Sequence, residues 1–407
     1  MLAPQWPDPP RQGAAIRNLQ ILLYLAERHQ VSLLTFQPEW DIDKTRISEA
    51  CVHAEALTPP DRTRHQRLKT LAASSLPDMA WRLHSVEMRQ RLMELCRHAY
   101  FDAIHIEGIE MAPYGLLAAR IQSRVQSSRF KVAYDAHNAE YLLQRRAFTT
   151  DLARPRRWPR AMYSLIQWLR LRRYERSVCL QSQHVITVSE ADRAALERLS
   201  PAVTGRAIVL PNGVDPEYWS READFAKMEL AGSSKSLVFD GTMDFRPNVD
   251  AVLWFASEVW PRIRAEQPNA HFFIVGRNPA REVLALADTP GVTVTGAVDD
   301  TRPWVASASV YVVPMRMGGG VRLKVLQAMS MGCAVVSTPM GIEGIEAQDG
   351  KEVALARSAS EFVQTTLMLL AQEERRAALG RAARALVAVR YAWKTLLPRL
   401  EQLYPPH

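Results

Sequence analysis

The stretch from Val310 to Glu346 constrains the fold more than any other part of the chain. It opens with a short apolar run, Val310 to Val313, which is typical of a buried strand. Three glycines follow at positions 318–320, where the backbone can bend sharply. Apolar residues at three-residue spacing then predict a helix, and another β-branched run at 335–336 predicts a second strand. The stretch therefore predicts a β-loop-α-β unit with a glycine loop before its helix.

This glycine loop lies at the predicted N-terminus of the helix. Unpaired N–H groups and the positive end of the helix dipole gather there, and both suit an anionic phosphate. Gly320, Lys324 and Gln327 fall on one stripe of the helix, so a cation and an amide can face the same ligand. A glycine turn with solvated charges would explain the same residues, because glycine loops alone are weak signals. These residues by themselves leave both interpretations open.

Further short motifs run through this stretch. They are Pro314, Gly318-Gly319-Gly320, Arg322-Leu323-Lys324, Ala328-Met329, Val335-Val336-Ser337-Thr338 and Gly341-Ile342-Glu343-Gly344. Together they resemble the donor-site signature of family-4 glycosyltransferases, in the branch associated with bacterial exopolysaccharide and exosortase gene clusters. The resemblance extends over nearly the whole chain. It implies a GT-B fold, with two doubly wound Rossmann-like α/β domains facing a cleft. It also implies retaining transfer of a hexose-type sugar from a nucleotide diphosphate to an acceptor hydroxyl.

Length and composition fit this class. A chain of 407 residues favours two domains over one core. Hydrophobic residues make up 47% and charged residues 23%, which is ordinary for a globular enzyme. The four cysteines have no paired spacing, so we expect neither a disulfide framework nor a zinc site, and a cytoplasmic protein. The net charge of +8 favours anionic partners such as nucleotide-sugars, anionic lipids or nucleic acid.

The pattern of strands and helices divides the chain into three parts. Residues 1–207 predict an acceptor-side Rossmann-like domain, and residues 208–381 predict a second domain that binds the nucleotide-sugar. Residues 382–407 resemble the family's terminal helix, which crosses back to the first domain. Only Met1-Leu2-Ala3 precede Pro4, where the family has its first strand. The chain therefore resembles a cropped family member, whose first strand we expect to be short or missing.

In the first domain, polar residues follow the strand predicted at 131–134. Open α/β sheets bind ligands at the carboxyl ends of their strands, although a structural histidine would explain His137 equally well. By resemblance, the Asp-x-His-Asn-x-Glu motif places His137 beside the transferred sugar and puts Asn138 and Glu140 on the acceptor side. The resemblance also assigns Gly13 and Arg17 to a loop that closes the floor of this site.

In the second domain, the loops at 241–248, 276–279, 296–300 and 315–320 are expected to share one rim of a parallel sheet. The family holds the nucleotide on this rim. Lys324 and Arg246 are therefore expected to act with His137 as catalytic residues, by stabilising the departing diphosphate. The expected donor-binding residues are Asn248, Gly276, Arg277, Val298, Gly319, Gly320, Val321, Arg322 and Gln327.

Two glutamates of the family pattern are absent. They normally lie eight positions apart across the glycine loop, where this chain has Gly319 and Gln327. Gln327 can hydrogen-bond a ribose, but an amide forgoes the charge-assisted strength of a carboxylate, on the order of 1 kcal/mol or more. Thr242 and Pro247 also replace a usual arginine and lysine. These departures keep open a catalytically degenerate partner or scaffold, beside a nucleotide-sugar 2-epimerase of the same architecture.

Metal and cofactor signals are weak. Asp41-Ile42-Asp43 is a DxD triplet of the kind that binds a divalent metal in another glycosyltransferase fold. Its polar surroundings give no further support for a metal site, and such triplets arise by chance. The resemblance implies a metal-independent reaction, so we expect neither a metal nor a cofactor.

The segment 151–176 is strongly basic and aromatic. It holds eight arginines against one aspartate and one glutamate, interleaved with tryptophans and tyrosines. An anionic membrane surface, RNA stacking or a plain surface helix would each suit this content. Lipid-linked acceptors are common in the family, and the chain contains no recognised nucleic-acid module. We therefore expect a UDP- or GDP-linked donor, a sugar or lipid-linked acceptor, no nucleic acid, and peripheral binding at the inner face of the membrane.

Overall fold

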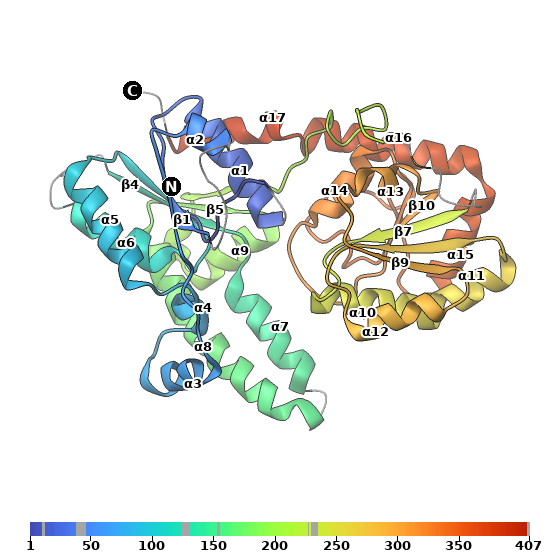
Figure 1. Ribbon diagram of the computed structural model, residues 1–407, viewed down its shortest axis with the longest axis horizontal. Helices are drawn as coiled ribbons and strands as arrows, with labels where there is room; N and C mark the ends of the chain where they lie inside the picture. Colours follow the sequence, from blue (N-terminus) through green and yellow to red (C-terminus); the bar gives the residue numbers. More distant parts are fainter. Residues whose placement is uncertain are drawn as a thin grey trace. The chain divides into compact units, whose positions relative to one another are not determined.

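The computed structural model describes residues 1–9, 13–37, 46–123, 130–152, 155–226, 228 and 235–404. The DxD triplet at 41–43 lies outside these residues. The chain forms two compact α/β units, each built on a parallel sheet (Figure 1). The first unit runs to Pro211 and includes the described residues from Leu397 onwards, and the second runs from Asn212 to Leu396. The helix at 373–390 lies in the second unit and packs on the helix at 323–330.

The first unit contains a parallel sheet in which β1 pairs with β2 and the remaining strands follow the order β3–β4–β5–β6. Its strands are β1 (Ser32–Phe36), β2 (His53–Leu57), β3 (Ala103–Glu107), β4 (Lys131–Ala136), β5 (His184–Thr187) and β6 (Ala207–Val209). Leu2 forms parallel bridges to Leu34 on β1 and to Ile106 on β3, and so joins the two parts. Its N–H donates to the His105 carbonyl and its carbonyl accepts from the Glu107 N–H, both at 2.9 Å. Leu2 thus takes the place of a strand between β1 and β3 as an isolated bridge.

The helices of the first unit follow from capping and proline signals. They are α1 (Gly13–Ala26), α2 (Arg46–Ala50), α3 (Arg64–Ala73), α4 (Asp78–Arg82), α5 (Val86–His98), α6 (Ala112–Gln122), α7 (Glu140–Leu152), η1 (Pro155–Arg157), α8 (Trp158–Gln181), α9 (Glu190–Leu199), η2 (Pro201–Val203) and η5 (Leu397–Gln402). The Ser85 side chain accepts from the Met88 N–H and so caps the start of α5, which separates α5 from α4. Gly13 to Arg17, expected as a loop, is the first turn of α1.

The second unit has a six-stranded parallel sheet in the order β12–β11–β10–β7–β8–β9. Its strands are β7 (Ser236–Asp240), β8 (His271–Val275), β9 (Val292–Gly296), β10 (Val310–Val313), β11 (Val335–Ser337) and β12 (Ala354–Leu355). The side chains of β7 and β10 are buried throughout, as expected for strands covered by helices on both faces. Large aromatic side chains fill this core, with Phe255 packed on Phe272 and Phe362.

The helices of the second unit alternate with its strands. They are α10 (Arg246–Trp254), η3 (Phe255–Val259), α11 (Trp260–Glu266), α12 (Arg281–Leu284), η4 (Ala285–Asp288), α13 (Arg302–Ala306), α14 (Leu323–Ser330), α15 (Ala359–Ala371), α16 (Glu373–Arg390) and α17 (Trp393–Leu396). α10, η3 and α11 follow one another without a break up to Glu266, and the π-helical turn η3 directly precedes Pro261. The expected terminal helix is interrupted at Tyr391.

Candidate functional site

The strand order of the second unit marks a place for a ligand. From β7 the chain passes to β8 and β9 on one side, and then returns to β10 on the other side of β7. The switch point of this doubly wound sheet therefore lies between β7 and β10, where open α/β sheets bind ligands at the carboxyl ends of the strands. The loops at this point are 241–245 and 314–322, so the expected glycine loop is at the switch point.

Lys324 projects from the first turn of α14 to this switch point. Its Nζ donates to the backbone carbonyl of Asp240, the last residue of β7, and to Asn248 Oδ1 at 3.0 Å. The amine also lies 4.0 Å from the centre of the Phe239 ring. Burial lowers the pKa of Lys324 to about 8, against the opposing effect of the Asp240 carboxylate. An ammonium group is thus held, partly desolvated, where the two loops meet.

Two glycines allow the loops to come this close. Gly241 has a φ of +151°, and a Cβ there would lie 2.5 Å from Lys324 Nζ. Gly276 has a φ of +145°, and a Cβ there would lie 1.8 Å from the Gly241 carbonyl oxygen. Any side chain at either position would therefore displace backbone or the lysine. Gly276 was expected to bind the donor. In the structure it allows the ends of β8 and β7 to pack closely together.

Asp240 and Tyr311 form a buried pair next to Lys324. The Tyr311 hydroxyl donates to Asp240 Oδ1, and both side chains are buried. Burial raises the pKa of Asp240, while Lys324 and Tyr311 act in the opposite direction. Sequence reasoning missed both residues. The available signal was an acidic residue at the end of the apolar run Leu237 to Phe239, and the same signal marks Glu107 after Ile106.

The other expected donor-side residues are distributed over the same loops. Asn248 is buried and donates from Nδ2 to the Thr242 carbonyl at 2.9 Å. Arg322 donates from Nη1 to the Met340 carbonyl at 2.5 Å, which fastens the glycine loop to the loop after β11. Arg246 is exposed at the start of α10. Arg277 follows β8 and Val298 follows β9. Gly319, Gly320 and Val321 belong to the glycine loop, and Gln327 lies on α14.

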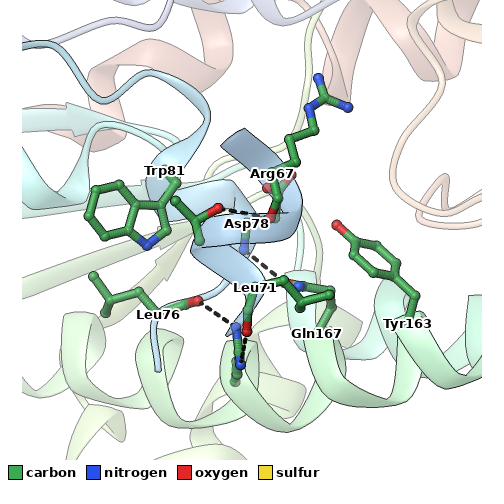
Figure 2. Close-up of a pocket in the computed structure, with 9 residues that line it drawn as sticks. Arg67, Leu71, Leu76, Asp78, Trp81, Tyr163 and Gln167 are labelled. Atoms are coloured by element: carbon green, nitrogen blue, oxygen red, sulfur yellow. Dashed lines mark hydrogen bonds between the residues drawn. The ribbon is translucent and has the colours of Figure 1, made fainter. Parts of the chain in front are cut away.

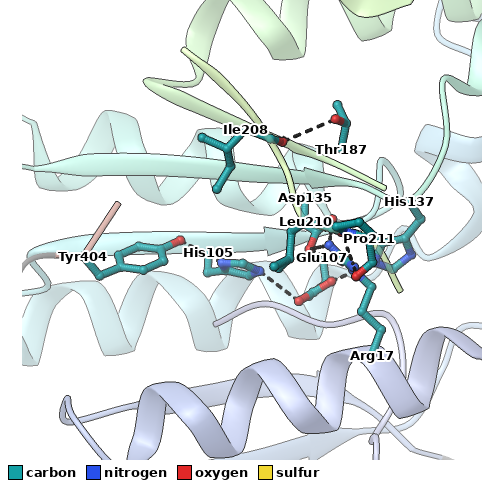
Figure 3. A network of polar contacts seen from close by, with 10 residues as sticks. All are labelled: Arg17, His105, Glu107, Asp135, His137, Thr187, Ile208, Leu210, Pro211 and Tyr404. Carbon is teal, nitrogen blue, oxygen red and sulfur yellow. Dashed lines mark hydrogen bonds and ion pairs between the residues drawn. The ribbon is translucent and has the colours of Figure 1, made fainter. Parts of the chain in front are cut away.

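The first unit gathers polar side chains at the carboxyl ends of β3 and β4. Glu107 and Asp135 are register partners on these strands, and His137 follows β4 (Figure 3). Arg17, only 1% exposed, forms a two-pronged ion pair with Asp135, at 2.8 Å from Nη2 to Oδ2 and 3.1 Å from Nε to Oδ2. It also donates to the Leu210 carbonyl at 2.8 Å. Arg17 thus ties α1 and the segment after β6 to β4.

Glu107 lies between two histidines. Its Oε2 is 2.7 Å from His137 Nε2, and its Oε1 is 2.8 Å from His105 Nε2. The Tyr404 hydroxyl is 2.7 Å from His105 Nδ1, so the four side chains form one chain of contacts (Figure 3). Burial opposes ionisation of Glu107, but the two histidines outweigh it and hold the pKa of the carboxyl well below its usual range.

The expected acceptor-side residues Asn138 and Glu140 lie beside this cluster. Asn138 Nδ2 donates to Glu140 Oε1 at 3.2 Å, and Glu140 begins α7. Burial and the nearby Glu110 carboxylate raise the pKa of Glu140 to about 7. Gly13 is exposed at the start of α1.

His105, Glu107 and Asp135 also have the geometry of a metal-ligand set, since one atom from each lies within 4.8 Å of the others. Arg17, however, contacts both carboxylate oxygens of Asp135. A cation at this place would have to displace a buried guanidinium group. The residues present therefore fit a hydrogen-bonded network better than a metal centre.

Comparison with known proteins decides the family. A model described as Glycosyltransferase Family 4 matches residues 11–218, just over half of the chain. This chain belongs to glycosyltransferase family 4. A second model, Glycosyl transferases group 1, matches residues 234–372, which include the whole β7–β10 switch point.

Two curated relatives match parts of this family-4 glycosyltransferase. A phosphatidyl-myo-inositol mannosyltransferase of Mycolicibacterium smegmatis is 29% identical over 214 residues, 50% of this chain and 53% of that protein. An uncharacterised 44.6 kDa protein in the cps region of Klebsiella pneumoniae is 24% identical over 137 residues, 32% of this chain and 35% of that protein. The chain thus spans about a third to a half of the length of these relatives. The cps-region relative agrees with the expected exopolysaccharide branch.

Solved structures agree on the fold. Sucrose-phosphate synthase from Thermosynechococcus elongatus superposes with a TM-score of 0.69 at 18% identity, over 99% of this chain and 97% of that one. HepE from Anabaena, solved in complex with UDP-glucose, gives a TM-score of 0.63 at 13% identity, over 99% and 98%. The expected GT-B class, with two Rossmann-like domains, is confirmed. Within the described residues, no helix has the length and apolar character needed to span a membrane.

Proposed function

We propose that this chain transfers a hexose-type sugar from a nucleotide diphosphate donor to an acceptor hydroxyl, with retention and without a metal. The observation that carries the proposal is the Lys324 ammonium, held at the β7–β10 switch point beside the glycine loop. Lys324 and the amides near Gly319 to Val321, at the N-terminal end of α14, would stabilise the charge that develops on the leaving diphosphate. The family relationship and the UDP-glucose complex of HepE support a nucleotide-sugar donor.

Side chains of the first unit would act on the sugar. His137 would orient or polarise the transferred sugar, and Asn138 and Glu140 would face the acceptor. The M. smegmatis mannosyltransferase and the cps-region relative support a role in glycolipid or exopolysaccharide synthesis, with a sugar or lipid-linked acceptor. We place this role in the cytoplasm.

Calorimetric titration with UDP and GDP tests this function. We expect one of the two nucleotides to bind, because the ammonium and the helix terminus attract a diphosphate. Binding of neither would favour a degenerate scaffold, for which the missing glutamates at Gly319 and Gln327 already argue. If one binds, incubation with the matching nucleotide-sugar alone distinguishes a transferase from an epimerase. An epimerase would convert the donor without any acceptor.

We further propose that α8 binds an anionic membrane surface. One face of this helix packs inward through Ser164, Gln167, Leu171 and Val178. The inward side also holds the α3–α4 segment, since the Asp78 N–H donates to Gln167 Oε1 at 2.7 Å and Arg170 donates to the Leu71 carbonyl at 2.7 Å (Figure 2). These contacts fix which side of α8 remains exposed.

The outward face of α8 carries the features of an interfacial helix. Trp158 is 56% and Met162 is 55% exposed, and exposed Leu169 and Leu180 continue the same stripe at helical spacing. Its C-terminal half adds three exposed arginines: Arg172, Arg173 and Arg176. An apolar stripe beside arginines complements a lipid surface that is apolar below and anionic above.

Vesicle co-sedimentation tests the membrane proposal. We expect binding to vesicles of anionic phosphatidylglycerol and weaker binding to neutral phosphatidylcholine. Replacing Arg172, Arg173 and Arg176 with glutamine should weaken binding to the anionic vesicles about a hundredfold, since each basic residue near the surface contributes about 1 kcal/mol.

A matched control removes three exposed arginines from α16 of the second unit, Arg375, Arg381 and Arg390. This variant carries the same charge change and should bind the vesicles like the unmodified protein. Equal losses in the two variants would mean that only net charge matters. Undiminished binding of the α8 variant would reject this helix as the docking face and favour a plain surface helix.

A further inference from the structure

The ionised carboxylate of Glu107 determines which groups donate and which accept in the network from Tyr404 to His137. An ionised carboxylate only accepts hydrogen bonds, so both His105 and His137 donate to Glu107 from Nε2. His105 Nδ1 lies 2.7 Å from the Tyr404 hydroxyl, a group that can either donate or accept, so the network continues to Tyr404. The amide of Asn18, turned so that its nitrogen meets acceptors, adds a third donor to Glu107, at 3.0 Å from Oε2.

We infer that Glu107 is the positioning residue of His137: by accepting a hydrogen bond from Nε2–H, it fixes the orientation of the ring for the transfer step. Glu107 is fully buried, whereas His137 is 20% exposed, so the histidine is the outer end of the network. With Nε2 committed to Glu107, Nδ1 is the nitrogen left to meet a substrate oxygen. The inference rests on the proposed role of His137 beside the transferred sugar, and it assigns Glu107 a role within that site.

The surrounding charges support a cationic His137. Burial by itself would lower the pKa of His137, but the hydrogen bond and the negative charge of Glu107 outweigh it, and the pKa is raised. Asp135 acts in the same direction and Arg17 opposes it. Further out, Glu110 faces Glu140, and Arg82 pairs with Glu110 at 3.0 Å. His105 is the remaining titratable neighbour, and it is bonded to the other oxygen of Glu107.

A cationic donor at this place has a chemical use. As the bond from the sugar to the diphosphate breaks, the sugar gains positive charge and the departing group gains negative charge, so a cationic donor would stabilise the step through oxygens of the departing group. An imidazolium whose orientation is fixed in advance needs no reorganisation during the step. A histidine without Glu107 would lose charge at a lower pH and exchange tautomers freely.

Two readouts on the full-length protein test the inference. Histidine side-chain NMR should show that His137 titrates above the ordinary histidine pKa, and that Glu107→Gln lowers this pKa. In the transfer assay, Glu107→Gln should reduce kcat about tenfold or more, and the alkaline limb of the pH profile should move to lower pH, because the neutral amide no longer favours the imidazolium. UDP or GDP affinity should remain unchanged, since the proposed nucleotide contacts are in the second unit.

Glu55→Gln is the matched control, because Glu55 also lies beside a histidine, His53, at 3.2 Å in the same unit. It should leave the His137 titration and kcat unchanged. Tyr404→Phe keeps Glu107 but frees His105 Nδ1, and should lower the His137 pKa by less than Glu107→Gln does. If Glu107→Gln fails to fold, this variant and the titration of the unmodified protein carry the test.

The outcomes separate this inference from the proposed function. A His137 titration at or below the ordinary pKa in the unmodified protein would overturn the role of Glu107, as would an identical titration in Glu107→Gln. An unchanged pH profile in a less active Glu107→Gln variant would also overturn it, since a purely structural loss lowers activity at every pH. Absence of any sugar transfer by the unmodified protein would instead remove the proposed function, while the NMR titration would still report on the pair.

Discussion

Arg17→Ala is expected to lower the free energy of unfolding by about 3–5 kcal/mol, the scale of breaking one side of a buried ion pair. Arg17 and Asp135 are 1% and 0% exposed, so removing the guanidinium leaves a carboxylate buried without its partner. The carbonyl of Leu210 would lose its donor as well. Urea denaturation measures the loss, and hydrogen exchange of the β3–β5 amides assigns it to the first unit.

Two further variants sharpen this prediction. Arg193→Ala removes an exposed partner of Glu190 in the same unit and should change the urea midpoint little. The double variant Arg17→Met with Asp135→Leu removes both charges, so it should be more stable than Arg17→Ala alone. A double variant less stable than Arg17→Ala would mean that the side chains contribute mainly through packing and not through their paired charges.

Much of the architecture could be predicted from local sequence. The apolar runs at 131–134, 310–313 and 335–336 lie in strands of the structure. A buried parallel strand is marked by its own residues, because both of its faces pack under helices. Leu2 could not be judged in this way. Three residues are too few for a pattern, and its place between β1 and β3 depends on partners more than thirty residues away.

The residues of the candidate site also differ in whether the local sequence marks them. Lys324 and His137 lie in short motifs that mark them in the sequence. Glu107 and Asp240 acquire their importance only from distant partners. Glu107 contacts α1, the residue after β4 and, through His105, the last described residue of the chain. Arg17 was expected in a loop that closes the floor of the site, and it lies inside α1. The carboxylate of Asp135 makes the burial of its guanidinium group favourable. Such pairings depend on strand order, which no local window contains.

Lys324→Ala is expected to raise the KM for the donor or lower kcat by about tenfold or more, the scale of one lost charged contact in a site that stabilises developing charge. Lys324→Met should behave alike, because it keeps an unbranched stem over the Phe239 ring and removes only the ammonium. Lys351→Ala removes an exposed lysine that pairs with Glu352 in the same unit, and should leave both constants unchanged.

The pH dependence of donor binding provides a second, independent reading of the same lysine. Because burial lowers the pKa of Lys324 to about 8, its ammonium is present below this pH and is lost above it. Nucleotide diphosphate affinity should therefore fall as the pH rises above about 8. In the complex, the pKa of Lys324 should be higher than in the free protein, because the bound diphosphate favours the charged amine. Lys324→Met should bind weakly at every pH without this step. Unchanged kinetics in both Lys324 variants, or a step that persists in Lys324→Met, would remove the lysine from the diphosphate site and with it the main support for transfer at the β7–β10 switch point.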